Sequence, residues 1–250
     1  MLTFEQLSFT LVPPLLLLGS GAVAAFHPPK AWLRGGILHL AAGVVFAVVA
    51  VELIPDLLRD HRPVETVIGF AIGVVLMLGL RSLTHKKEEH EKEERTSLPP
   101  DSADRSKLPF GMLAGTAIDL VVDGFMIGIG FAAGAKEGRM LAVALGVELV
   151  SLGLAVAASM VKIGVPRGRS LKVLSVLAVT FVLGAVVGTL LLSKLSSHWL
   201  AGVLSFGAAA LLFLVTEELL TEAHEEKETP ALTAMFFVGF LVFLMLGMVS

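Results

Sequence analysis

Eight long apolar runs constrain the fold of this chain more than any other feature of its sequence. A bilayer hydrocarbon core about 30 Å thick requires about 20 apolar residues in a helix. The runs span approximately residues 5–26, 33–58, 64–83, 108–134, 138–163, 170–193, 198–222 and 230–249. An unsatisfied backbone amide is costly in lipid, so each run is expected to be helical. The predicted fold class is an all-α integral membrane protein with eight transmembrane helices.

The composition agrees with a membrane protein and excludes several kinds of site. Charged residues make up 16% of the chain, whereas about a quarter is usual for soluble domains. Cysteine is absent, which excludes disulfides, iron–sulfur clusters and cysteine nucleophiles. Oxygen, imidazole and thioether groups remain as metal ligands, and no basic patch indicates a nucleic-acid partner. No Lys or Arg precedes the first run, so it is expected to be a retained helix and not a signal peptide.

One connection between the runs is long. Residues 84–107 are rich in Lys, Glu and His, and they contain few apolar side chains that could form a core. We expect a mobile cytoplasmic loop here, within a single transmembrane domain that spans residues 1–250. Lys and Arg gather on the side of this loop, which the positive-inside rule assigns to the cytoplasm. Both termini are therefore expected to be extracytoplasmic, in a multi-pass protein of a plasma or inner membrane.

Acidic residues interrupt two of the central runs. Asp119 and Asp123 lie near the middle of the run at 108–134, and Glu148 lies at a similar depth in the next run. An acid at the centre of a transmembrane helix costs about 2.5–3.5 kcal/mol or more, so it normally faces the bundle interior and has a function. Asp119 and Asp123 are one helical turn apart, and their mutual repulsion calls for a cation or a shared proton. We predict that these three acids bind a divalent metal ion. Protonated carboxyl groups that hydrogen-bond the neighbouring backbone are the structural alternative.

Two further acidic clusters lie at the ends of runs. Glu52 and Asp56 close the second run, which ends on the expected outer side. Glu217, Glu218 and Glu222 close the seventh run, which ends on the expected cytoplasmic side. We predict that the first cluster is an outer entrance for metal and the second an inner exit. Carboxylates that simply extend into the headgroup region are the alternative for the residues nearest the helix ends.

The chain contains an internal repeat. The second and seventh runs match when Glu52 is aligned with Glu218, and the fourth and fifth match when Asp119 is aligned with Glu148. Many transporters are built from repeats that enter the membrane from opposite sides, with the substrate site near the midplane between them. The register of the acids therefore predicts an inverted repeat around the central acids and transport by alternating access.

These motifs resemble those of the ZIP (Zrt/Irt-like) family of divalent metal transporters. Residues 119–124 are similar to the family pattern H-N-x-P-[DE]-G, residues 148–153 to [HQ]-[ED]-x-P-[HE]-G, and residues 217–224 to H-E-x-x-P-E-x-H. The resemblance covers essentially the whole chain. It implies a 3+2+3 inverted arrangement of helices and transport of Zn or Fe. Together with the carboxylate ligand set, the predicted substrate is a divalent ion of the Zn, Fe or Mn class. The metal is then the transported substrate, and neither a prosthetic group nor an enzymatic activity is expected.

The central motifs depart from the family pattern in a way that affects the number of ions. Family members often bind two metals, and Asp119 replaces the histidine of the fourth-helix motif. Leu120, Leu149 and Leu152 stand where a second ion would need ligands. The resemblance therefore implies that a single metal position remains, built from the three central acids.

The sequence leaves several alternatives open. Carboxylates suit harder ions such as Mn, whereas the resemblance implies Zn or Fe, so the metal is not determined. A proton or other cation transporter could use the same acids, and a transport-inactive ZIP-like scaffold or sensor would also fit the altered motifs. A metalloenzyme is disfavoured because the chain contains no H-E-x-x-H motif. The expected partners are the lipid bilayer and the metal ion, and a homodimer is one assembly that the sequence allows.

Overall fold

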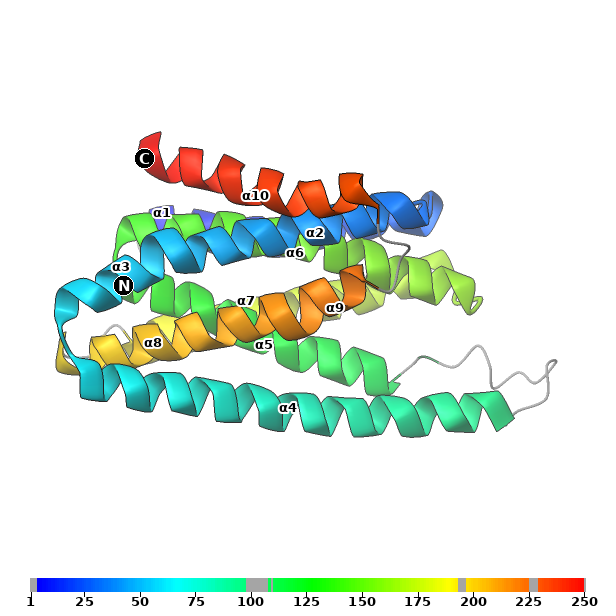
Figure 1. Cartoon of the computed structure of the whole chain (residues 1–250). Coiled ribbons are helices and arrows are strands. Elements are labelled where there is room, and N and C mark those ends of the chain that lie inside the picture. The colour runs from blue at the N-terminus through cyan, green and yellow to red at the C-terminus, as the bar shows by residue number, and fades with distance from the viewer. Residues whose placement is uncertain (1–3, 98–107, 109, 193–196, 225–228, 250) are drawn as a thin grey trace.

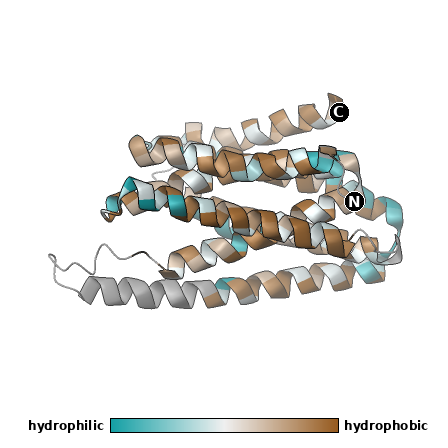
Figure 2. Ribbon diagram, turned by 180° about the vertical axis from the view of Figure 1, so that it is seen from behind, coloured by the Kyte–Doolittle hydropathy of each residue, from teal (hydrophilic) through white to brown (hydrophobic). Residues whose placement is uncertain are grey.

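The computed structural model describes residues 4–97, 108, 110–192, 197–224 and 229–249 (Figure 1). Every regular element in these ranges is a helix, and eight stretches are long and apolar enough to cross a membrane. Exposed Leu, Val, Ile and Phe side chains are numerous, and Figure 2 shows apolar residues along most of each helix and hydrophilic ones mainly near the ends. The predicted all-α fold with eight transmembrane helices is confirmed.

Six crossings are single helices and two are composite. The single helices are α1 (Phe4–Phe26), α4 (Pro63–Ser97), α5 (Phe110–Ala133), α6 (Ala135–Lys162), α7 (Arg167–Leu192) and α10 (Pro230–Val249). One composite crossing joins α2 (Ala31–Val48), η1 (Val49–Leu53) and α3 (Ile54–Asp60). The other joins α8 (Ser197–Phe213), η3 (Leu214–Leu219) and α9 (Leu220–Ala223).

The two composite crossings carry a π-helical segment at equivalent positions. Glu52 lies in η1, and Glu217 and Glu218 lie in η3. A π-helical turn is rare and is frequently found at functional sites, where it changes the face on which the following side chains lie. The alignment of Glu52 with Glu218 therefore also aligns the two π-helical segments of the backbone.

The packing of the helices follows the same repeat. The most extensive contacts are those of α1 with α6, α5 with α7, α2 with α10, and α4 with α8. Exchanging the first three crossings for the last three, and the fourth for the fifth, converts the first pair into the second and the third pair into the fourth. Figure 1 shows α2 and α8 running in opposite directions. The structure thus contains the inverted repeat that the acids predicted.

Glycine allows the close approach of helices within these pairs. A Cβ atom at Gly124 or Gly128 of α5 would overlap the backbone of α7, and one at Gly184 or Gly188 of α7 would meet the backbone of α5. Such small-residue contacts are a common basis of helix association in membranes. The other three pairs also contain glycines that face backbone atoms: Gly153 in α6, Gly43 in α2, Gly239 in α10 and Gly69 in α4.

The tight pairs divide the crossings into two groups. The first, which we call the α5 group, contains α1, α5, α6 and α7. The second, which we call the α2 group, contains α2–α3, α4, α8–α9 and α10. Within the α5 group, α1 and α7 also pack together, as do α5 and α6. The groups meet mainly where α2 packs on α6, with smaller contacts of α5 with α4 and α8. The boundary between the groups is the place where the acidic residues gather.

The first half of the connection at residues 84–107 is helical in the structure. Helix α4 continues to Ser97 and projects beyond the other helices at the end opposite the two termini (Figure 1). Lys and Glu are good helix formers, so a charged segment can extend a helix into water although it cannot form a core. Residues 98–107 lie outside the described part of the chain, and the mobility of this connection stays a prediction.

Candidate metal site

Helix α5 places Asp119 and Asp123 one turn apart at the boundary between the two groups. The Asp123 side chain is 5% exposed, and its Oδ2 atom has no hydrogen-bond partner among the described residues. Asp119 is half-buried. A buried carboxylate oxygen without a partner is costly unless it is protonated or meets a cation, so Asp123 is the residue here most in need of a ligand.

A small cavity opens beside these two acids. Residues from three helical segments line it: Met77 of α4, Asp119, Val122, Asp123 and Met126 of α5, and Ala210, Leu211, Leu214 and Glu218 of α8–η3. It has room for about one water-sized body. The cavity therefore brings carboxylates of both groups to one space that could hold a single ion.

Glu148 lies near this cavity but does not line it. Its side chain is 4% exposed on α6, and Oε2 has no hydrogen-bond partner in the described ranges. The charges of Asp123, Glu218 and Asp119 all act on it. No three His, Asp or Glu residues within the described part of the chain are grouped closely enough to share an ion in this arrangement. The predicted set of Asp119, Asp123 and Glu148 would have to move closer together to bind the same metal.

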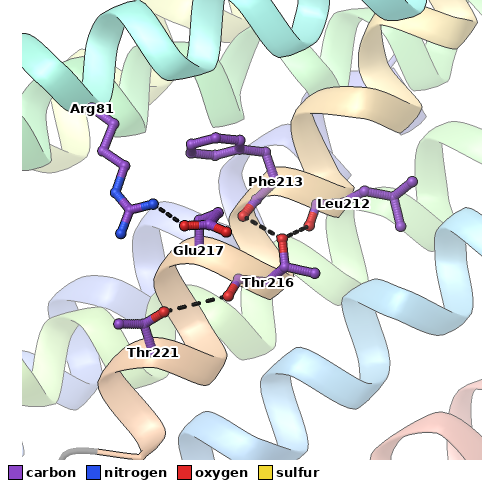
Figure 3. A network of polar contacts seen from close by, with 6 residues as sticks. All are labelled: Arg81, Leu212, Phe213, Thr216, Glu217 and Thr221. Atoms are coloured by element: carbon purple, nitrogen blue, oxygen red, sulfur yellow. Dashed lines mark hydrogen bonds and ion pairs between the residues drawn. The ribbon is translucent and has the colours of Figure 1, made fainter.

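The two neighbouring glutamates of η3 have different surroundings. Glu218, predicted as part of an inner exit, lines the central cavity. The Glu217 carboxylate accepts a hydrogen bond from Arg81 of α4, whose guanidinium also lies 6.0 Å from the centre of the Phe213 ring (Figure 3). Glu217 is thus held by an arginine in this arrangement, while Glu218 faces the cavity. Glu222, one turn further along, is half-buried, and its charge acts on Glu218.

Basic side chains engage both acids of the predicted outer entrance. Glu52 is 6% exposed, and its Oε1 atom lies 3.6 Å from Nζ of Lys136, the second residue of α6. Lys136 also donates a hydrogen bond of 3.3 Å to the Gly247 carbonyl of α10. Asp56 accepts a hydrogen bond of 3.4 Å from the exposed Arg59. Lys136 was not predicted from the sequence as a partner of Glu52. It could have been, because both residues lie near the same expected membrane surface.

A protein-family model described as ZIP Zinc transporter matches residues 80–247, which is most of the chain. The chain belongs to the ZIP family. This match includes the central acids, Glu218 and Lys136. A search of curated proteins found no matching sequence.

Membership of the ZIP family determines the broad activity. The protein is a multi-pass membrane protein of a family that transports divalent metal, zinc in particular, and the family consists of transporters, not enzymes. The match begins within α4, so α2 with Glu52 lies before it. The symmetric packing of α2 and α8 nevertheless shows that the first crossings complete the same ZIP repeat as the last ones.

Proposed function

We propose that this ZIP protein transports one divalent metal ion at a time through the cavity lined by Asp119, Asp123 and Glu218, with Glu148 as a further carboxylate beside it. The observation that carries the proposal is the convergence of these acids from both helix groups on one small cavity. The charges that act on Glu148 all belong to other carboxylates. A divalent cation offsets this repulsion in a medium of low dielectric, which gives the cavity its affinity for metal.

The residues around the cavity favour a first-row transition metal over Mg or Ca. Met77 and Met126 are buried and line the cavity, where their thioether sulfurs can contact an ion. Thioethers are soft ligands, and carboxylates accept Zn and Fe(II) as well as Mn. The mixed lining supports Zn or Fe as the substrate more than the carboxylates do alone.

Alternating access follows from relative motion of the two helix groups. Glycine-mediated backbone contacts hold the helix pairs within each group together, whereas the cavity lies between α5 of one group and η3 and α4 of the other. The Lys136–Glu52 ion pair joins α6 to the second crossing, so it links the groups at the end where both chain termini lie (Figure 1). We infer that this end is extracytoplasmic and that the pair keeps it closed, while the ion leaves past Glu218 and Glu222.

The neighbouring glutamates of η3 provide a matched test of the proposed path. We expect Glu218→Gln to lower the initial rate of Zn²⁺ uptake into proteoliposomes at least about tenfold, because a cavity carboxylate is lost; about 1.4 kcal/mol corresponds to tenfold. Glu217→Gln should lower it by less than about threefold, because a partly exposed ion pair contributes about 0–1 kcal/mol. Equal effects of the two variants would contradict the assigned cavity. If the parent protein takes up no divalent ion, a scaffold or sensor role replaces the transport proposal.

A charge exchange tests the Lys136–Glu52 contact. We expect Lys136→Glu alone to lower Zn²⁺ uptake at least about tenfold, since it places a second carboxylate beside the buried Glu52. The double variant Glu52→Lys with Lys136→Glu should restore uptake to within about threefold of the parent, because the contact requires opposite charges and not a particular order. Arg59→Glu, which alters an exposed ion pair, is the control and should have little effect. If the double variant stays inactive while correctly folded, Glu52 acts as a metal ligand and not as the partner of Lys136.

A further inference from the structure

A second pair of metal-ligating side chains lies away from the central cavity, at the end of α9. His39 of α2 and His224, the residue after α9, have ring centres 5.7 Å apart, and their planes are inclined by 79°. His39 is 2% exposed, whereas His224 is exposed. Two imidazoles that are far apart in the sequence thus meet where α2 packs against α9. One is fixed inside the bundle and the other is accessible from outside.

The hydrogen bond of His39 prepares its ring for a metal. Nδ1 lies 2.8 Å from the Gly35 carbonyl oxygen, which can only accept, so Nδ1 carries the hydrogen and donates. In the neutral imidazole, Nε2 is then the nitrogen with the free electron pair. Histidines that bind metals usually donate their other ring nitrogen to a carbonyl or carboxylate in this way, which fixes both the tautomer and the ring orientation. The Gly35 carbonyl therefore holds the His39 ring in the tautomer that can bind metal through Nε2.

The separation of the two rings fits a shared tetrahedral ion. With metal–nitrogen bonds of about 2.0–2.1 Å, two imidazoles on one tetrahedral Zn²⁺ have ring centres roughly 5–6 Å apart. The distance between His39 and His224 falls in that range. We propose that these two residues form a second metal site for a borderline ion such as Zn²⁺, with water in the remaining positions. Imidazole suits Zn²⁺, Co²⁺ and Ni²⁺, and it does not suit Mg²⁺ or Ca²⁺.

The position of the pair indicates what the site does. Both histidines belong to the α2 group of helices, so the pair stays assembled when the α5 group moves. His224 follows Glu222 by two residues, on the side of η3 away from α8. This role rests on the function proposed above, in which an ion that leaves the central cavity past Glu218 and Glu222 reaches the pair next. With two protein ligands the site holds metal in an exchangeable form, which suits a release station at the mouth of the path.

Cobalt titration of the purified full-length protein tests this site directly. Four-coordinate Co²⁺ absorbs visible light much more strongly than six-coordinate Co²⁺, and imidazole ligands shift the bands relative to those of an all-oxygen site. We expect this signal in the parent and in Asp123→Asn, which alters the central cavity. His224→Gln should weaken the Co²⁺ affinity measured by the signal at least about tenfold, and His39→Gln should do the same. Excess Mg²⁺ should not displace the signal, whereas Zn²⁺ should.

The choice of variants distinguishes metal binding at the histidine pair from metal binding in the central cavity. His224 is exposed, so its replacement leaves the fold intact even if His39→Gln, at a buried position, does not. His27→Gln changes an exposed histidine after α1 and should leave the titration unchanged. A titration of His224→Gln that superimposes on the parent would overturn the proposal. Loss of the signal in Asp123→Asn but not in His224→Gln would place the imidazole-type absorption elsewhere and overturn it equally. Zn²⁺ uptake by the same variants reports on the central path independently.

Discussion

Replacing Asp123 by Asn is expected to reduce metal uptake by the reconstituted protein at least about a hundredfold. The substitution removes a negative charge from a side chain that is 5% exposed and whose Oδ2 atom has no hydrogen-bond partner among the described residues. A contact between a carboxylate and a divalent ion contributes several kcal/mol even at an effective dielectric constant of about 20. Each 1.4 kcal/mol changes affinity about tenfold, so two factors of ten are a conservative expectation. Asn has nearly the same shape as Asp, so the helix packing should be retained.

The measurement is the initial rate of Zn²⁺ uptake into proteoliposomes that contain equal amounts of folded protein. Asp60→Asn is the matched control, because Asp60 is an exposed acid at the end of α3. This control should transport at the rate of the parent. An Asp123→Asn protein that transports Zn²⁺ normally would remove Asp123 from the metal path. If the variant loses a proton or monovalent cation flux while the parent carries no Zn²⁺, the same acids serve a different cation.

Replacing Gly124 by Ala is expected to destabilise the protein by about 3 kcal/mol or more. A Cβ atom at this position would overlap the Phe181 carbonyl oxygen and crowd the Ala185 amide nitrogen of α7. Backbone atoms cannot turn aside as a flexible side chain can, so α5 and α7 must separate along much of their contact. Overpacking of a well-packed core costs about 1–3 kcal/mol and sometimes more. The loosened pair would also displace Asp123, the neighbouring residue in the sequence.

Thermal unfolding in detergent, followed by size-exclusion chromatography, measures this effect. A loss of about 3 kcal/mol corresponds to a fall in Tm of about 6–12 °C for a chain of this size. Gly19→Ala in α1 is the control, since an added Cβ atom there meets no other atom within 4 Å. It should leave Tm unchanged or slightly raised, because Ala is the better helix former. A Gly124→Ala protein as stable as the parent would mean that α5 and α7 pack less closely than described.

The sequence alone determined the fold class, the number of crossings and the family. Lipid leaves no alternative to hydrogen bonding within the helix, so a run of about 20 apolar residues is enough to predict a transmembrane helix. Burying charge in lipid is costly as well. The sequence therefore identified Asp119, Asp123 and Glu148 as functional candidates, because little else explains acids at that depth. The alignment of Glu52 with Glu218 could also be predicted, because acids are rare in such runs. The π-helices and the symmetric helix pairs agree with this alignment.

Only the tertiary structure decided which polar side chains meet. Glu218 lines the central cavity and Glu217 pairs with Arg81, a difference that depends on the direction of successive side chains in a π-helix. Lys136 reaches Glu52, and His39 reaches His224, across long separations in the sequence. Hydropathy is nearly uniform around a helix that is apolar on all sides, so it does not report which face meets which neighbour. Close glycine contacts between backbones determine those faces, and they depend on the packing of whole helices and not on any local motif.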